Sequence, residues 1–262
     1  MSDPRTKIVG DGYDAMADTW EAWAGQVEDD PRAEWLEQLV SRLPEGARVV
    51  ELGCGNGTAE TVALARRFRL TGVDLSGEQL RRARERVPGA EFLQADFTAL
   101  ELEHGSLDAV AAFYSFNHVP RDLLAHLFGR IHQWLVPGGL FLAALGAGDT
   151  DDWFGEWLGA PMFFSSFPPE TNSRLLAEAG FELERDELVT IREPKSSLRD
   201  ETSSTGCDAG WLARTQGARI AEAMSATEDT ARRRAARPDG TALHSETSSK
   251  GDATFQWVLA RR

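Results

Sequence analysis

The sequence is poor in cysteine and in long apolar runs, and each shortage excludes a class of protein. Its 262 residues include two cysteines, Cys54 and Cys207, which are too few for a disulfide framework. The apolar runs are shorter than the stretch of about 20 residues that a membrane-spanning helix needs, so we expect no membrane partner. The first residues lack the charged-then-apolar pattern of a signal peptide, and we therefore expect a cytoplasmic protein.

Positive charge is also scarce relative to negative charge. Lys and Arg number 28 against 42 Asp and Glu, which gives a formal net charge of −14. A surface this acidic repels a polyanion, so we expect no nucleic acid partner. The same charge weakly favours a neutral or cationic small-molecule ligand over an anionic one, and the oligomeric state stays open.

The order of apolar segments predicts an α/β fold with a parallel sheet covered by helices on both faces. Residues 1–45 are predicted to form an N-terminal helical cap, with one helix near 12–27 and another beginning at Pro31. Residues 46–194 are predicted to form a Rossmann-like core. Its strands are expected at 48–53, 69–76, 90–96, 107–115, 139–147 and 181–193.

Three other segments differ from this alternation. Residues 149–168 are rich in aromatic residues without a clean period, and we interpret them as an irregular cap segment. Residues 195–250 are rich in Ser, Thr, Ala, Arg and Glu, and we expect a disordered insertion there. A functional lid or docking element is the alternative for that segment. Residues 251–262 return to an apolar pattern and are predicted to supply the final strand of the core.

A glycine-rich turn follows the first predicted strand. Residues 51–57 read ELGCGNG, and glycines at alternate positions allow a sharp turn and a close approach of ligand to backbone. The helix that follows directs its N-terminus at such a ligand. The dinucleotide-binding pattern GxGxxG requires glycine at position 58, where this sequence has Thr58.

Two acidic residues end the next two predicted strands. Asp74, in GVDLS, is placed to accept hydrogen bonds from both hydroxyls of a ribose. Asp96 and Phe97, in ADF, form a pair that could accept from an adenine amino group and cover the ring. Ser76 is expected to cap the following helix, with Gln79 completing a capping box.

Taken together, these motifs resemble motif I and the following motifs of class I S-adenosylmethionine-dependent methyltransferases, over about residues 10–193 and 252–262. The similarity is greatest to the small-molecule and natural-product type. The resemblance implies a seven-stranded sheet of order 3-2-1-4-5-7-6 with strand 7 antiparallel, and S-adenosyl-L-methionine as cofactor. It implies cofactor contacts for Tyr13, Glu51, Gly53, Cys54, Gly55, Asp74, Leu75, Asp96, Phe97 and Phe113.

Residues for the chemistry are expected where the fourth predicted strand ends, because α/β sheets bind ligands at the carboxyl ends of their strands. His118 and Tyr114 are the candidates for a catalytic general base. Cys54 is interpreted as a small filler rather than a nucleophile, and no metal site is expected. Aromatic residues in the two cap segments favour an apolar or aromatic methyl acceptor.

Three other functions compete with methyl transfer to a small molecule. A nicotinamide-dependent oxidoreductase could use a similar sheet, although Thr58 argues against it. A methyltransferase fold could serve binding or a non-methylating reaction. A peptide-modifying methyltransferase could use residues 195–250 to recruit its peptide.

Overall fold

The computed structural model describes residues 3–194 and 250–262. The predictions for 195–249 and for Cys207 therefore lie outside the described residues. The helices are α1 (Pro4–Ala15), α2 (Ala17–Ala24), α3 (Arg32–Val40), α4 (Ala59–Arg67), α5 (Gly77–Arg86), α6 (Arg121–Trp134) and α7 (Pro169–Glu178), with a 3₁₀ turn η1 (Phe116–His118). The strands are β1 (Arg48–Leu52), β2 (Arg69–Asp74), β3 (Glu91–Gln94), β4 (Leu107–Ala112), β5 (Leu135–Gly146), β6 (Thr150–Trp157), β7 (Ala160–Ser166), β8 (Glu182–Pro194) and β9 (Lys250–Arg261).

The central sheet has seven strands in the order β3-β2-β1-β4-β5-β9-β8. Strands β6 and β7 pair only with each other, so β8 and β9 are the sixth and seventh strands of the central sheet. Counted in this way, the sheet has the predicted order 3-2-1-4-5-7-6. Strand β9 pairs antiparallel with both β5 and β8, whereas β1 to β5 pair in parallel, so the predicted α/β class is confirmed.

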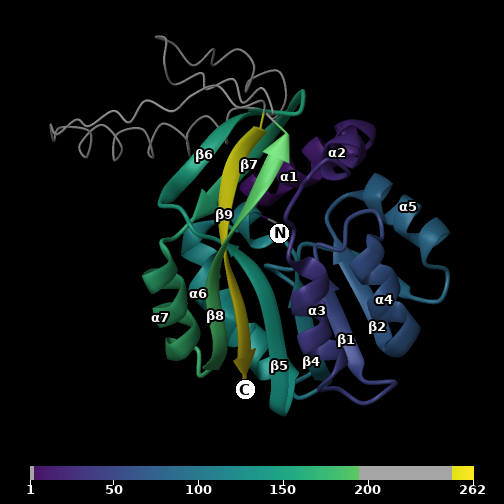
Figure 1. Ribbon diagram of the computed structural model, residues 1–262, viewed down its shortest axis with the longest axis vertical. Helices are drawn as coiled ribbons and strands as arrows, with labels where there is room; N and C mark the ends of the chain where they lie inside the picture. Colours follow the sequence, from purple (N-terminus) through teal and green to yellow (C-terminus); the bar gives the residue numbers. More distant parts are fainter. Residues whose placement is uncertain (1–2, 195–249) are drawn as a thin grey trace, which may run out of the picture. The chain divides into compact units, whose positions relative to one another are not determined.

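Helices lie against both faces of the sheet (Figure 1), and an apolar layer fills the space on each side. One layer packs α3 and α4 against the sheet, and within it the rings of Trp35 and Trp257 stack with centroids 5.5 Å apart. The other packs α6 and α7 against the opposite face, around Phe128 and Phe141. The innermost strands bury side chains on both faces, which explains their nearly continuous apolar sequence. No helix in the described ranges is long and apolar enough to cross a membrane.

The expected irregular cap segment over 149–168 is wrong, because most of it forms a β-hairpin. Strands β6 and β7 pair antiparallel from Thr150↔Ser166 to Trp157↔Ala160. Leu158 and Gly159 make the two-residue turn, with φ of 52° and 83°. Positive φ at both central residues is the geometry that fits the twist of a hairpin. Leu158 is a poor sequence signal for it, since this conformation favours Gly, Asn and Asp.

The first predicted helix, near 12–27, is also placed wrongly. Helix α1 begins at Pro4, where Asp3 caps it by accepting a hydrogen bond from the Arg5 backbone N–H at 2.8 Å. The chain breaks at Met16 before α2 begins. An acidic cap followed by proline is a typical helix start, and it outweighs the aromatic periodicity further along.

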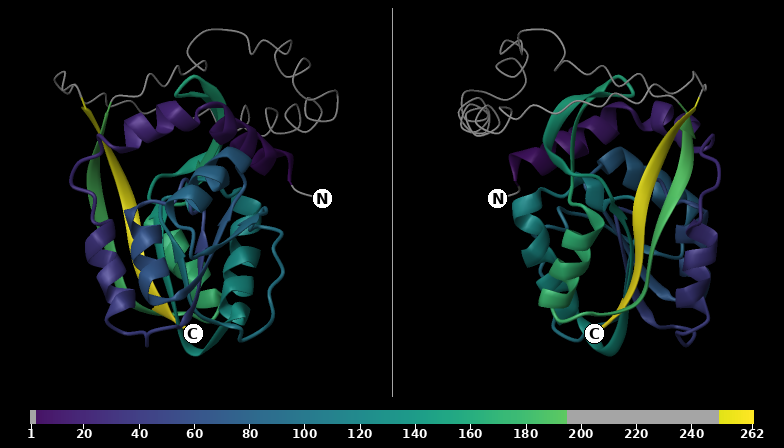
Figure 2. Two further views of the ribbon diagram at one scale, coloured as in Figure 1. Left: turned by 90° about the vertical axis from the view of Figure 1, so that its right-hand side faces the viewer. Right: turned by 60° about the vertical axis from the view of Figure 1, so that its left-hand side comes forward.

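Helices α1 and α2 lie across the end of the sheet where the parallel strands finish, beside the β6–β7 hairpin (Figure 2). We call α1, α2 and this hairpin the cap. Helix α1 contacts both β7 and α5. The cap therefore covers the carboxyl ends of the parallel strands, where most of the predicted site residues lie.

Candidate functional site

The glycine-rich turn after β1 has the backbone geometry that its spacing predicts. Gly53 and Gly55 have φ of 75° and 53°. A Cβ on Gly53 would lie 2.3 Å from the Cβ of Ser115, so only glycine fits there. The N–H of Gly55 donates to Oδ2 of Asp74 at 2.9 Å. The turn and the end of β2 are thus fastened to each other.

Glu51 is a buried carboxyl group with an unsatisfied oxygen. Its side chain is 2% exposed, and Thr61 donates a hydrogen bond to Oε1 at 3.2 Å. Oε2 has no hydrogen-bond partner among the described residues. Burial raises the pKa of Glu51 to about 8. A buried acceptor without a partner marks a place where a ligand could donate.

Asp74 ends β2 with both oxygens directed at backbone amides. Besides Gly55, the N–H of Ser76 donates to it at 2.9 Å. Burial raises the pKa of Asp74 above its ordinary value, while these amide hydrogen bonds oppose the shift.

Ser76 caps α5 as predicted, because its Oγ accepts from the N–H of Gln79 at 3.0 Å. The second half of the expected capping box is wrong. The N–H of Ser76 donates to Asp74, and neither amide atom of Gln79 has a partner in the described part of the chain. Instead, Asp14 from α1 accepts from the Ser76 hydroxyl at 2.6 Å and from the Glu78 N–H at 3.0 Å.

Asp96 follows β3 and is 8% exposed. Its Oδ1 accepts from the N–H and hydroxyl of Thr98, and its Oδ2 accepts from the hydroxyl of Thr6 at 2.7 Å. No local sequence pattern marks Thr6 or Asp14, since both reach the site only after α1 has docked.

The remaining predicted cofactor residues take different positions. Leu75 borders α1, since a Cβ on Gly10 would lie 3.2 Å from its Cβ. The Cys54 thiol lies against Gly72 inside the sheet, and burial raises its pKa. In this position the small Cys54 side chain fills space in the protein interior. The ring of Phe97 stacks on Phe116 with centroids 5.8 Å apart, and the ring of Phe113 tilts toward Trp257 at 6.1 Å.

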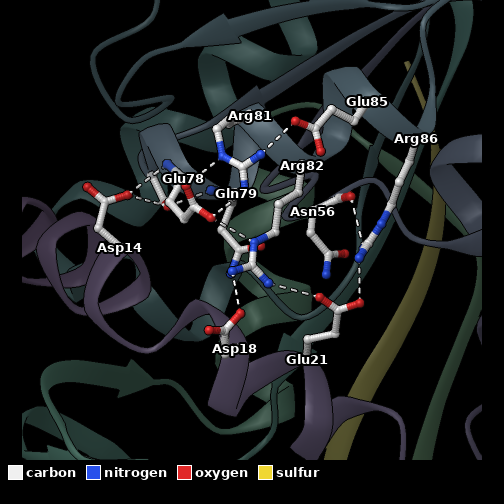
Figure 3. A network of polar contacts seen from close by, with 11 residues as sticks. Asp14, Asp18, Glu21, Asn56, Glu78, Gln79, Arg81, Arg82, Glu85 and Arg86 are labelled. Carbon is white, nitrogen blue, oxygen red and sulfur yellow. Dashed lines mark hydrogen bonds and ion pairs between the residues drawn. The ribbon is translucent and has the colours of Figure 1, made fainter.

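A set of ion pairs fastens α2 to α5 (Figure 3). Arg82 forms ion pairs with Asp18 at 2.5 Å and with Glu21 at 3.0 Å, and Arg86 also pairs with Glu21. Arg86 additionally donates to the carbonyl of Asn56 in the glycine-rich turn, at 3.2 Å. These contacts tie the cap to the same turn that Asp74 holds.

The N-terminal end of α1 is held in place by Arg5. The Arg5 guanidinium forms ion pairs with Asp3, Asp122 and Asp152 at 2.8, 2.8 and 2.9 Å. Asp122 belongs to α6 and Asp152 to β6, so one side chain joins three elements. Further along, α1 packs closely on β7. A Cβ placed on Gly12 would lie only 2.5 Å from the Pro161 carbonyl oxygen.

Tyr13, in helix α1 of the cap, and His118, in η1, form a hydrogen-bonded pair. The Tyr13 hydroxyl lies 2.9 Å from Nε2 of His118, and Nδ1 of His118 lies 2.8 Å from the Phe163 carbonyl oxygen. A carbonyl only accepts, so Nδ1 carries the proton and the Tyr13 hydroxyl donates to Nε2. Burial lowers the pKa of His118 to about 4, which keeps the imidazole neutral.

The structure gives Tyr114, the other predicted catalytic residue, a different set of partners. Its hydroxyl donates to Asp30 at 2.9 Å, and its ring packs against Phe255 at 4.6 Å between centroids. Its φ of 60° turns the backbone sharply after β4. Tyr114 and His118 therefore lie in separate hydrogen-bond networks.

Comparisons with known proteins agree with this geometry. A family model described as a methyltransferase domain matches residues 49–139. The chain is 40% identical over 118 residues to trans-aconitate 2-methyltransferase of Paracidovorax citrulli, covering 43% of this chain and 44% of that protein. It is 31% identical over 160 residues to 27-O-demethylrifamycin SV methyltransferase of Amycolatopsis mediterranei, covering 53% and 58%. The matches thus span about half the length of these curated relatives.

Among solved structures, the fold is similar to that of the Burkholderia thailandensis 1,6-didemethyltoxoflavin-N1-methyltransferase. The TM-score is 0.59 at 15% sequence identity, covering 100% of this chain and 91% of that one. Residues 49–139 therefore form a methyltransferase domain, and the described part of the chain has the class I fold of S-adenosylmethionine-dependent methyltransferases.

Proposed function

We propose that this chain transfers a methyl group from S-adenosyl-L-methionine to a small molecule with an apolar or aromatic body. The observation that carries the proposal is the unpaired Oε2 of Glu51 beside a glycine-rich turn whose conformation excludes side chains. A ligand with an ammonium group would satisfy that oxygen.

The residues at the carboxyl ends of β1, β2 and β3 fit such a cofactor. Glu51 would hold the ammonium group, and the backbone of the glycine turn would face the carboxylate at the start of α4. Asp74 would accept from the ribose and Asp96 from the adenine. When bound, the cofactor supplies an electrophilic methyl group on a sulfonium sulfur.

The cap would exclude water and hold the acceptor in line. Orientation of two reactants can contribute several kcal/mol of barrier reduction without any group on the protein changing its charge. Helix α1 packs tightly on β7 at Gly12, so the docked cap would limit the access of water from this side. The Arg5 and Arg82 ion pairs would have to break or bend for ligands to exchange.

We propose that the Tyr13–His118 pair orients the acceptor and that neither His118 nor Tyr114 acts as a strong base. The pKa of His118 is about 4, far below the range in which a histidine removes protons efficiently at neutral pH. Burial raises the pKa of both Tyr13 and Tyr114, so neither phenol ionises readily. These groups suit an acceptor atom that is nucleophilic without first losing a proton.

Titration calorimetry with S-adenosylhomocysteine tests the cofactor site. We expect wild-type protein to bind at micromolar concentration and Asp74→Ala to lose most of that affinity. Asp11→Ala is the matched control, because Asp11 is exposed on α1 and, among the described residues, its side chain pairs only with Lys7. Failure of the wild type to bind this ligand, together with binding of NADH, would support an oxidoreductase instead.

Release of S-adenosylhomocysteine from S-adenosylmethionine and a panel of acceptors tests turnover. Binding without any such release would favour a fold used for binding or for a non-methylating reaction.

A further inference from the structure

Glu193 is an acidic residue at the carboxyl end of β8 that the proposed cofactor site does not use. It pairs with Gly251 of β9 in the ladder. Side chains alternate along a strand, so Glu193 lies on the same face as Ile191, which belongs to the apolar layer under α3 and α4. The next residue, Pro194, accepts a hydrogen bond from the indole N–H of Trp23 in α2, at 3.1 Å. Glu193 thus lies where the cap meets the sheet.

The charge of Glu193 acts on Tyr13 and on Tyr114. This negative charge contributes to the raised pKa values of Tyr13 and of Tyr114. The Tyr13 phenol also experiences the charge of Asp74, on the cofactor side. The Tyr13 phenol is therefore influenced both by an acidic group of the proposed cofactor site and by Glu193.

Glu193 is only partly exposed, and within the described ranges its carboxylate is given no hydrogen bond and no ion pair. Burial raises its pKa. A partly desolvated carboxylate without a partner is unfavourable, and a cation or a hydrogen-bond donor would relieve it.

Trp23, which donates to the Pro194 carbonyl beside Glu193, belongs to a group of aromatic rings in the cap. The ring of Tyr13 contacts those of Trp20 and Trp157 edge to face, with centroids 6.1 and 6.2 Å apart. The ring of Trp23 contacts that of Trp157 at 5.2 Å. We call Tyr13, Trp20, Trp23 and Trp157 the aromatic cluster. Indole and phenol faces attract cations and also stack on flat apolar ligands.

The arginines of the cap and of the elements that contact it, by contrast, are paired with carboxylates. Arg5 pairs with three carboxylates, as described above, and Arg32 pairs with Asp30 and Glu60. Arg121 pairs with Asp149 and donates to the Ser166 carbonyl. The cap and the sheet edge, as far as the structure describes them, therefore present no free guanidinium to an anionic acceptor.

We propose that Glu193 and the aromatic cluster form the acceptor subsite, and that the acceptor is an aromatic molecule with a basic nitrogen that pairs with Glu193. This inference rests on the proposed function, since it names the substrate class of the same site. It separates this chain from an enzyme that acts on a carboxylate-rich acceptor, which would require free cations in the same place.

Two probes with the same ring and opposite charge test the subsite. Tryptamine carries an ammonium group and indole-3-propionate carries a carboxylate. Each is titrated into full-length protein saturated with S-adenosylhomocysteine, and binding is followed by calorimetry. We expect tryptamine to bind at least about tenfold more tightly, the preference of one charge-assisted hydrogen bond. Glu193→Gln should abolish the preference while leaving the affinity for S-adenosylhomocysteine unchanged.

Glu187→Gln is the control variant, because Glu187 is on the same strand but exposed and paired with Arg185. It should keep the wild-type preference. Equal binding of the two probes, tighter binding of indole-3-propionate, absence of tryptamine binding, or a preference that survives in Glu193→Gln would each overturn the inference. In every one of these cases S-adenosylhomocysteine still binds, whereas its failure to bind would overturn the proposed function and this inference with it.

Discussion

Substitution of Gly12 by alanine measures how closely the cap is packed. In an exposed helix, Gly→Ala stabilises the folded state by about 1 kcal/mol through backbone entropy. In α1, however, the new Cβ would lie 2.5 Å from the Pro161 carbonyl oxygen and 3.0 Å from the Met162 methyl carbon. The methionine side chain can move, but the carbonyl belongs to the backbone of β7. The helix must therefore shift away from the hairpin by about 1 Å to restore ordinary contact.

The free energy of that shift can be compared with the entropic gain. Overpacking of a tight contact typically destabilises by about 1–3 kcal/mol. We therefore expect Gly12→Ala to lower the free energy of unfolding by about 0–2 kcal/mol after the helical gain is included. Displacement of α1 also strains the hydrogen bond from Thr6 to Asp96, so amide hydrogen exchange in α1 should accelerate.

Gly129→Ala is the matched control for this measurement. Gly129 lies within α6, and a Cβ there would meet no atom within 4 Å. It should raise the free energy of unfolding by about 1 kcal/mol, or the melting temperature by about 2–4 °C. Denaturant unfolding and hydrogen exchange of both variants give the comparison. If the two substitutions change stability equally and α1 exchanges at the wild-type rate, the close packing of α1 on β7 is refuted.

Three further predictions concern charge. Burial raises the pKa of Glu51 to about 8, so between pH 5 and 8 the folded state binds more protons than the unfolded state; the free energy of unfolding should fall as pH rises through this range, and Glu51→Gln should flatten the fall in denaturant titrations. The pKa of His118 is lowered to about 4, so the unfolded state binds more protons below pH 6.5; stability should drop by about 3 kcal/mol as pH falls from 6.5 to 4, and His118→Gln should lack this drop. Arg82→Ala should accelerate hydrogen exchange in α2 at low salt, and high salt should remove the difference from wild type because these ion pairs are near the surface.

The central sheet could be predicted because its strands carry their signal locally. In β1 and β4 nearly every side chain is buried, and β1 ends at glycines that the sequence shows directly. Likewise the positive φ of Gly53 and Gly55 follows from the spacing of the glycines. The strand order came from the family resemblance, and the hydrogen-bonded ladders confirm it.

The cap could not be predicted in the same way, since its order comes from contacts between distant residues. Trp153 faces Phe164 and Phe154 faces Phe163 across the β6–β7 hairpin, so both sides of each strand carry aromatic rings and the alternation is hidden. The pair of Tyr13 and His118 joins residues that are far apart in the sequence. Only the docking of α1 brings them within hydrogen-bond distance, and no local pattern records it.

The pairing of β8 with β9 extends further than the pairing of β9 with β5. Strand β5 stops at Gly146, opposite Phe255, whereas β8 and β9 continue as a two-stranded ribbon to Pro194 and Lys250. The points where the chain leaves and re-enters this ribbon are thus opposite each other, with Cα atoms about 5 Å apart, as in any antiparallel pair. Doubling the length of a loop adds only about 0.6 kcal/mol to the free-energy cost of closing it. The stability of the sheet therefore depends little on the length of the segment that connects β8 to β9. We therefore expect that a protein domain whose own termini are adjacent could replace residues 195–249 and leave the strand register unchanged.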